Sequence, residues 1–316
     1  MNFEKIALFV TIISLSILIG CNKVVDVQEP DTETVPDATI TAIKNDYPDA
    51  AKFVFKTLLK DKLWKAKFIS NASNFETQVS PTAIVAQVYR ESSDLTLYKN
   101  LTDKLKVKGG SISGVQLADK ATDNGARMKY VFNGKPFLLN YYILNDWHII
   151  KLTAKAPSES FVVDTGDLPA AIQSFCQQKS ISLANSTTNL ITDSDGKKTY
   201  YIYPAAQLYP LIFSDAGDLL WIARNSDGSN VVNKANNEVG TAELLAKVTE
   251  GYEDFTTPTN VAFESQFDGL KSVRYVLQKK SGVEGTRTFI NELREVFVNA
   301  TTGEIIYDQY SSYVFR

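Results

Sequence analysis

The sequence predicts an α+β protein made of tandem units, each with one helix packed on a small antiparallel β-sheet. Apolar residues recur at helical spacing in four places, and each place is followed by short runs rich in β-branched and aromatic residues. Turn pairs such as Asn133-Gly134, Asp195-Gly196 and Thr302-Gly303 separate these runs and favour hairpins. Since each helix and each set of strands has one apolar face, the two can bury one another.

The helices are expected to begin at a capping residue and to carry one apolar stripe each. The expected caps are Asp37, Asp94, Asp167 and Thr241. The third stripe holds Ile172 and Cys176, and the fourth holds Leu244, Val248 and Tyr252. Strands are predicted at 52–56, 63–68, 83–89, 111–117, 127–132, 137–144, 147–152, 188–192, 199–203, 209–214, 219–223, 273–278, 288–298 and 304–310.

The predicted units follow one another along the chain and group into two pairs. The first pair spans 38–157, divided into 38–92 and 93–157, and the second spans 158–316, divided into 158–238 and 239–316. Whether the four units form two domains or one continuous array stays open.

The N-terminal residues point to export and lipidation. An apolar stretch from Ile6 to Ile19 has the length of a signal-peptide core and is too short to span a membrane. It ends in Leu18-Ile19-Gly20-Cys21, which resembles a bacterial lipobox. That resemblance implies removal of a lipoprotein signal peptide, residues 1–20, and attachment of lipid such as palmitate to Cys21. The alternatives are an ordinary secretory signal and a buried helix that happens to contain Cys21.

The segment after the cysteine reads as a tether. Residues 21–37 are acidic, contain two prolines and lack helical periodicity, which is typical of a disordered linker. Asn22 stands where the resemblance would place aspartate for retention at the inner membrane, so an outer-membrane location is expected. The sequence leaves open whether the protein faces the periplasm or the cell surface.

Short motifs in three units resemble the PepSY-like family of bacterial envelope proteins, whose shape is related to β-lactamase-inhibitor-like domains. Asp167-Leu-Pro-Ala-Ala-Ile172 is similar to the helix start of that family, and Leu211–Trp221 is similar to its closing hairpin. The stretches 42–50 and 297–306 carry related patterns. The resemblance implies a helix on a small antiparallel sheet and a binding or inhibitory role outside the cytoplasm, and it implies no catalytic residues.

The composition and the scarce nucleophiles disfavour several function classes. A net charge of −3 and a pI near 5.4 are unlike those of nucleic-acid-binding proteins. The single histidine, His148, has no nucleophile motif beside it, and Cys176 lies on an apolar helix stripe, where a thiol is usually inert. The chain has too few His and Cys residues for a zinc site, and Asp193-Ser-Asp195-Gly196 lacks the closing glutamate of a calcium loop. We therefore expect a protein without catalytic residues, metal or cofactor.

Rows of tyrosine form the candidate binding surface. Tyr201 and Tyr203 share one face of a predicted strand, and Tyr141 and Tyr142 lie in another. Exposed tyrosines could stack on sugars or anchor a protein partner, whereas buried ones would be cross-strand packing partners.

The favoured functional prediction is a lipid-anchored, non-enzymatic protein of the bacterial envelope that binds another protein in a binding, inhibitory or scaffolding role. The alternative is a cell-surface lipoprotein that binds glycans. A hydrolase that uses carboxylates alone ranks last.

Overall fold

The computed structural model describes most of the chain after residue 33. The described residues are 34–94, 110–120, 125–144, 147–155, 157, 159–193, 195–205, 209–225, 233–235, 239–255, 261–282 and 289–315. Cys21, the signal peptide, most of the tether and the helix predicted after Asp94 lie outside them.

The fold is mostly β, which corrects the prediction of tandem helix-on-small-sheet units. Strands account for 55% of the structure and helices for 13%. The described part of the chain holds three α-helices, α2 (Asp37–Asp46), α4 (Ala170–Gln178) and α5 (Ala242–Thr249), and a 3₁₀ turn η2 (Thr165–Asp167). Its strands form two large antiparallel sheets in place of four small ones.

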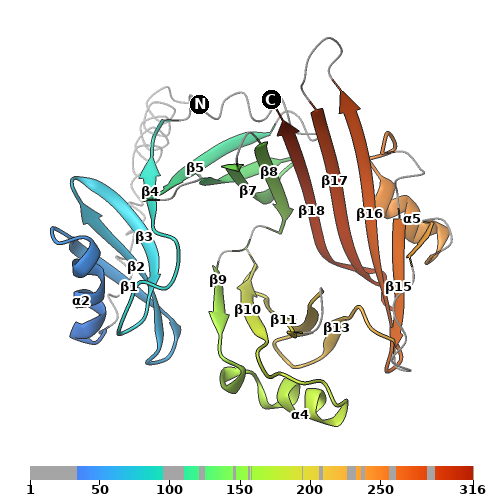
Figure 1. The fold of residues 1–316 in the computed structure, drawn as a ribbon, viewed down its shortest axis with the longest axis horizontal. Coiled ribbons are helices and arrows are strands. Elements are labelled where there is room, and N and C mark those ends of the chain that lie inside the picture. The colour runs from blue at the N-terminus through green and yellow to red at the C-terminus, as the bar shows by residue number, and fades with distance from the viewer. Residues whose placement is uncertain are drawn as a thin grey trace, which may run out of the picture.

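The larger sheet has thirteen strands in the order β1-β2-β3-β4-β5-β6-β7-β8-β18-β17-β16-β15-β14 (Figure 1). A separate small sheet in each unit would leave two open edges per unit, whereas here β4 pairs with β5 and β8 pairs with β18. The bounds are β1 (Ala51–Leu59), β2 (Leu63–Ser70), β3 (Ser73–Val79), β4 (Tyr89–Ser92), β5 (Ser111–Ala118), β6 (Ala126–Phe132), β7 (Lys135–Leu144), β8 (Trp147–Ala154), β14 (Asn233–Ala235), β15 (Val261–Phe267), β16 (Leu270–Gly282), β17 (Phe289–Asn299) and β18 (Glu304–Phe315).

The smaller sheet has five antiparallel strands in the order β13-β12-β11-β10-β9, and α4 covers one of its faces. Ile172 and Cys176, predicted to share a helix face, are both buried against it. The bounds are β9 (Glu159–Val163), β10 (Thr187–Thr192), β11 (Lys198–Tyr203), β12 (Leu211–Ser214) and β13 (Leu219–Trp221).

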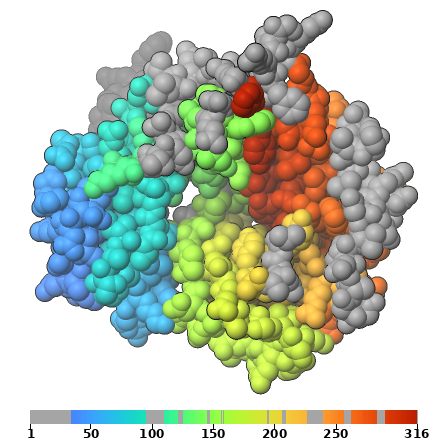
Figure 2. Space-filling model, in the orientation of Figure 1, coloured from blue at the N-terminus to red at the C-terminus, as the bar shows by residue number. Residues whose placement is uncertain are grey.

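The smaller sheet joins the two ends of the larger one and closes the molecule into a ring. Leu63, beside the β1–β2 turn, and Phe267, beside the β15–β16 turn, are buried in the same hydrophobic cluster under α4. An ion pair flanks each junction: Lys62 Nζ contacts Asp167 at 2.7 Å, and Lys179 Nζ contacts Asp268 at 2.6 Å. Figure 2 shows an opening in the middle of this ring.

The other two helices cover the outside of the larger sheet. α2 packs on β1–β3 through Ala42 and Ile43, and Tyr47, just after the helix, joins the same cluster. α5 packs through Leu244 and Val248 on the buried residues of β5–β8 and β15–β18. The side chains that alternate with these buried residues along the strands therefore lie on the face toward the opening.

Four local predictions are wrong. The strand predicted at 83–89 is absent up to residue 88, where the chain forms bends and a single bridge between Ile84 and Val79; Tyr89 begins β4, and β3, which was not predicted, lies before this segment. Asp37 does not cap α2, since Pro36 precedes the helix and Asp37 is its first residue. Asp167 does not cap α4, since the residue before the helix is Pro169, and its carboxylate accepts from Lys62 instead. Tyr252 lies beyond the end of α5.

Candidate functional site on the inner face of the ring

The inner face of the larger sheet is the face that meets the smaller sheet at both ends. Tyr307, near the start of β18, packs edge-to-face on Tyr201 of β11, with ring centroids 6.5 Å apart. Near the β1 end of the larger sheet, Lys65 of β2 contacts Glu159 of β9 at 3.5 Å. Because alternate residues of a strand share a face, these contacts assign the other inner-face residues through the strand register.

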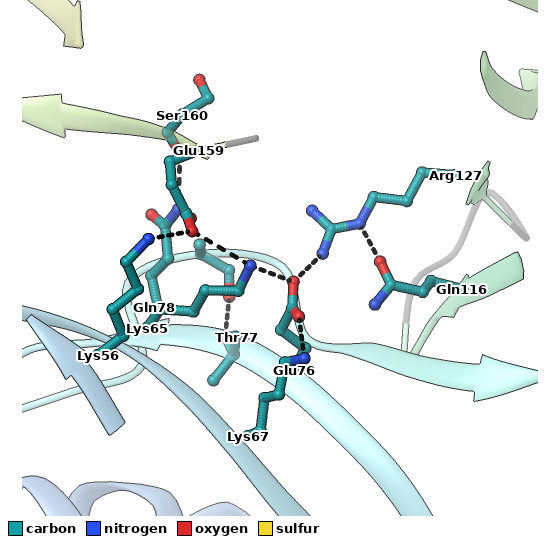
Figure 3. Close-up of polar contacts among 11 residues, drawn as sticks. Lys56, Lys65, Lys67, Glu76, Thr77, Gln78, Gln116, Arg127, Glu159 and Ser160 are labelled. Carbon is teal, nitrogen blue, oxygen red and sulfur yellow. Dashed lines mark hydrogen bonds and ion pairs between the residues drawn. The ribbon is translucent and has the colours of Figure 1, made fainter. Parts of the chain in front are cut away.

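A buried carboxylate organises the inner face at β2–β6 (Figure 3). The Glu76 side chain is 11% exposed and contacts Arg127 Nη2 at 2.7 Å, Lys65 Nζ at 3.2 Å and Lys67 Nζ at 3.8 Å. Arg127 Nε also donates to Gln116 Oε1 at 2.6 Å, and its guanidinium lies 3.8 Å from the centroid of the Tyr89 ring. A carboxylate withdrawn from water needs such partners, so these contacts offset the desolvation of Glu76.

The same cluster attaches β9 to the larger sheet. Glu159 contacts both Lys65 and, at 3.1 Å, Lys56. The Gln78 side-chain amide donates to the Ser160 carbonyl at 2.6 Å (Figure 3). Four cations thus share two carboxylates, and each carboxylate of the cluster is engaged. The arrangement is suited to holding the ring closed, because its ion pairs join β9 to β1 and β2.

A central patch of nine inner-face residues lies on β7, β8 and β18, in the middle of the larger sheet. The register aligns them in three rows across the strands: Tyr142, Ile149 and Tyr313; Asn140, Lys151 and Ser311; Leu138, Thr153 and Gln309. Lys151 is the central residue and the one charged member. Its Nζ lies 5.7 Å from the centroid of the Tyr142 ring.

A cleft of about 510 Å³ lies between the two sheets, next to the central patch. Tyr201, Tyr307, Ile191 and Phe137 provide apolar lining. Lys197 and Glu304, 3.1 Å apart, link β18 to the residue before β11 at its exposed edge. The cleft also includes Lys135, Lys155, Asp193, Asp195 and Asp308, so its rim carries charges of both signs.

The structure separates the four predicted tyrosines. Tyr201 is 7% exposed and packs between the sheets, and burial raises its pKa. Tyr203 is 36% exposed. Its pKa is raised, mainly by partial burial and to a smaller extent by the charge of Glu295. Tyr142 lies in the central patch, whereas Tyr141 points to the opposite face of β7, where its hydroxyl and His148 Nδ1 are 2.8 Å apart. Tyr141 therefore does not share a surface with the other three.

The groups with catalytic potential are engaged or buried. His148 is hydrogen-bonded to the Tyr141 hydroxyl. The Cys176 thiol is 1% exposed, and burial raises its pKa to about 11. Among the residues that the structure describes, no three His, Cys, Asp or Glu side chains are grouped so that they could hold a metal ion.

Sequence reasoning missed Glu76, Arg127, Asn140 and Lys151. Alternating charge in Lys65-Ala-Lys67 and polar alternation in Glu76-Thr-Gln78 were the available signals that one face of these strands is polar. The partners of these residues come from strands that are distant along the chain, and alternation within one strand does not identify them.

None of the protein-family models, curated proteins or solved structures compared with this chain matches it. Across the described ranges, no helix is both long and apolar enough to cross a membrane.

Proposed function

We propose that this chain is a lipid-anchored, non-enzymatic binding protein of the bacterial envelope, and that it binds an extended segment of a partner protein along the free edge of β9. The observation that carries this proposal is a groove of about 380 Å³ beside that edge. We call it the edge groove. It is lined by Leu59, Lys62, Leu63, Gln78, Val85, Ala86, Ser160, Phe161, Val162, Asp164 and Asn189.

The edge groove gathers exposed apolar side chains. Val162 is 60% exposed and Val85 is 53% exposed, and both are among the few large hydrophobic residues on the described surface. Proteins usually blunt an open sheet edge with charge or proline because such an edge invites pairing. An exposed valine on β9 is therefore favourable for a binding role.

Backbone groups are available at the same place. β9 pairs with β10 on one side and ends the smaller sheet on the other. The Ser160 carbonyl accepts from Gln78, which lies across the edge groove, and residues two apart in a strand direct their backbone groups to the same side. Val162 thus presents its N–H and carbonyl to the groove, where an added strand could bind them while its side chains contact Val162 and Val85.

Anchoring is the second part of the proposal and rests on the lipobox at Cys21. A lipidated cysteine followed by a flexible acidic segment would hold the ring at a membrane surface. The Cys21→Ser variant should leave the membrane fraction after a salt wash. Retention of this variant on membranes would contradict lipid anchoring without bearing on the edge groove.

The edge groove is tested by affinity capture from a solubilised envelope extract of the source organism, using the full chain in detergent. We would compare the unchanged protein with Val162→Lys and with a matched control, Leu144→Lys, whose leucine is 55% exposed at the end of β7. A protein recovered near equal stoichiometry by the unchanged chain and the control, and lost with Val162→Lys, supports the proposal. Equal recovery by all three chains, or recovery of no protein, contradicts it.

A further inference from the structure

The Lys151 ammonium in the central patch has no carboxylate partner within the described part of the chain. Its neighbours in the row across the strands are Asn140 and Ser311, and its Nζ lies near the Tyr142 ring. Two inner-face arginines, in contrast, are paired: Arg127 contacts Glu76 at 2.7 Å, and Arg274 contacts Glu295 at 2.5 Å. Because a half-buried ammonium is partly withdrawn from water, it favours an anion brought by a ligand.

The surroundings of Lys151 add to this preference. Lys129 of β6, whose register partner is Leu138 of the central patch, is a second ammonium without a carboxylate contact among the described residues. The patch itself holds no acidic residue. Ser311 is buried, and the Gln309 amide donates to the Thr153 hydroxyl at 3.1 Å. The Asn140 amide and the hydroxyls of Tyr142 and Tyr313 are the groups that can hydrogen-bond a neutral polar ligand.

The position of the patch in the sheet decides between ligand classes. β7, β8 and β18 each have a strand on both sides, so their backbone groups are already paired. A peptide would find no ladder to extend there, in contrast to the edge of β9. A ligand on this face must be recognised by side chains alone, which suits a polyhydroxylated molecule. The faces of Tyr142 and Tyr313, at one border of the patch, can pack on a sugar ring.

We propose that the central patch binds a carboxylate-bearing sugar of an acidic polysaccharide, with Lys151 and Asn140 contacting the carboxylate. The patch faces the opening seen in Figure 2, which is bordered by the parts of the surface coloured as β3, β7–β8 and β9–β10. This site is separate from the edge groove and does not depend on the proposed protein partner.

Calorimetric titration of the full chain in detergent tests this inference. The probes are polygalacturonate and alginate, with methyl-esterified polygalacturonate as the uncharged match and polyglutamate as the acidic peptide. We expect at least one polyuronate to bind, the ester to bind at least tenfold more weakly, and polyglutamate not to compete. Binding of neither polyuronate overturns the inference, and so does equal binding of polyglutamate.

Variants locate the binding to the patch. Lys151→Gln should weaken polyuronate binding at least tenfold, whereas the matched control Lys60→Gln, in the exposed β1–β2 turn, should leave it unchanged. Tyr142→Ala should also weaken binding, and Tyr142→Phe should restore it, since the ring is retained. Equal weakening by Lys151→Gln and Lys60→Gln would show attraction by overall charge and would contradict a built site. Lys151→Gln should still capture the protein partner as the unchanged chain does. The two sites can therefore fail or succeed independently.

Discussion

Trp221 of β13 stacks on Phe297 of β17, with ring centroids 4.2 Å apart and planes inclined by 10°. The indole Nε1 also donates to the Val273 carbonyl of β16 at 3.1 Å. A single side chain of the smaller sheet thus makes a ring contact and a hydrogen bond with two strands of the larger one. Both contacts are buried, so the sheets meet through a dry aromatic junction.

Trp221→Ala should destabilise the protein by about 3–5 kcal/mol, because it leaves a cavity between the sheets and a carbonyl without its donor. The measurement is urea unfolding followed by circular dichroism. Trp147→Ala is the control, since Trp147 is half-buried and contacts Phe315, the last residue of β18. A smaller loss for Trp221→Ala than for Trp147→Ala would contradict the junction.

Gly217 and Gly196 form a matched pair for separating backbone strain from steric overlap. Both have positive φ, +91° and +81°, which penalises any residue with a side chain. A Cβ at Gly217 would lie 2.5 Å from the Ala171 Cβ of α4, whereas a Cβ at Gly196 meets nothing within 4 Å. Gly196→Ala should cost about 1 kcal/mol, and Gly217→Ala should cost about 1–3 kcal/mol more. Equal costs, measured by thermal unfolding, would place the β12–β13 turn away from α4.

Arg294 is 7% exposed and should be among the most sensitive charged positions. Its Nε and Nη2 donate to the two Asp308 oxygens at 3.0 and 2.8 Å, and Nη1 donates to the Val248 carbonyl of α5. Arg294→Met should cost about 3–5 kcal/mol, since it leaves the partly buried Asp308 carboxylate without its cationic partner.

Lys271→Met is the control for Arg294. It breaks a more exposed pair with Glu264, 3.0 Å apart, and should cost less than about 1 kcal/mol. Similar unfolding midpoints in urea for the two variants would show that burial of Arg294 contributes little.

The Cys176 thiol should react with a thiol reagent only after unfolding. Burial raises its pKa to about 11 from an ordinary value of 9.0, so little thiolate exists near neutral pH. Since the raised pKa favours the neutral thiol in the fold, its contribution to stability is complete below pH 9 and declines as the pH rises toward 11. In a Cys21→Ser background, labelling at pH 8 should be far slower in buffer than in urea. Equal rates would mean that α4 does not cover the thiol.

Local structure could be predicted where the residues that determine an element lie within one short segment of the sequence. The stripe of Ile172 and Cys176 gives the buried face of α4, and Asn133-Gly134 turns β6 into β7 with positive φ at both residues. The joining of all these hairpins into one sheet could not be predicted. It depends on the pairing of β8 with β18, and no local pattern specifies a strand partner so distant in the chain.

The same limit applies to the candidate site. The tyrosine rows indicated aromatic surfaces, but Tyr201 is buried between the sheets and the Tyr141 hydroxyl is hydrogen-bonded to His148. Tyr142 lies near Lys151, and no sequence pattern had pointed to that lysine. The family resemblance of the short motifs stays a prediction, since those motifs occupy a helix start and hairpins that many sheets contain.

The hydrophobic cluster under α4 also constrains the order of folding. It is completed by Leu63 and Phe267, which lie roughly 200 positions apart in the chain. Until both have arrived, part of the apolar face of α4 and its sheet stays open to water, and contacts of such long range form slowly. The interval before ring closure is therefore the period in which the chain is most exposed to aggregation and proteolysis.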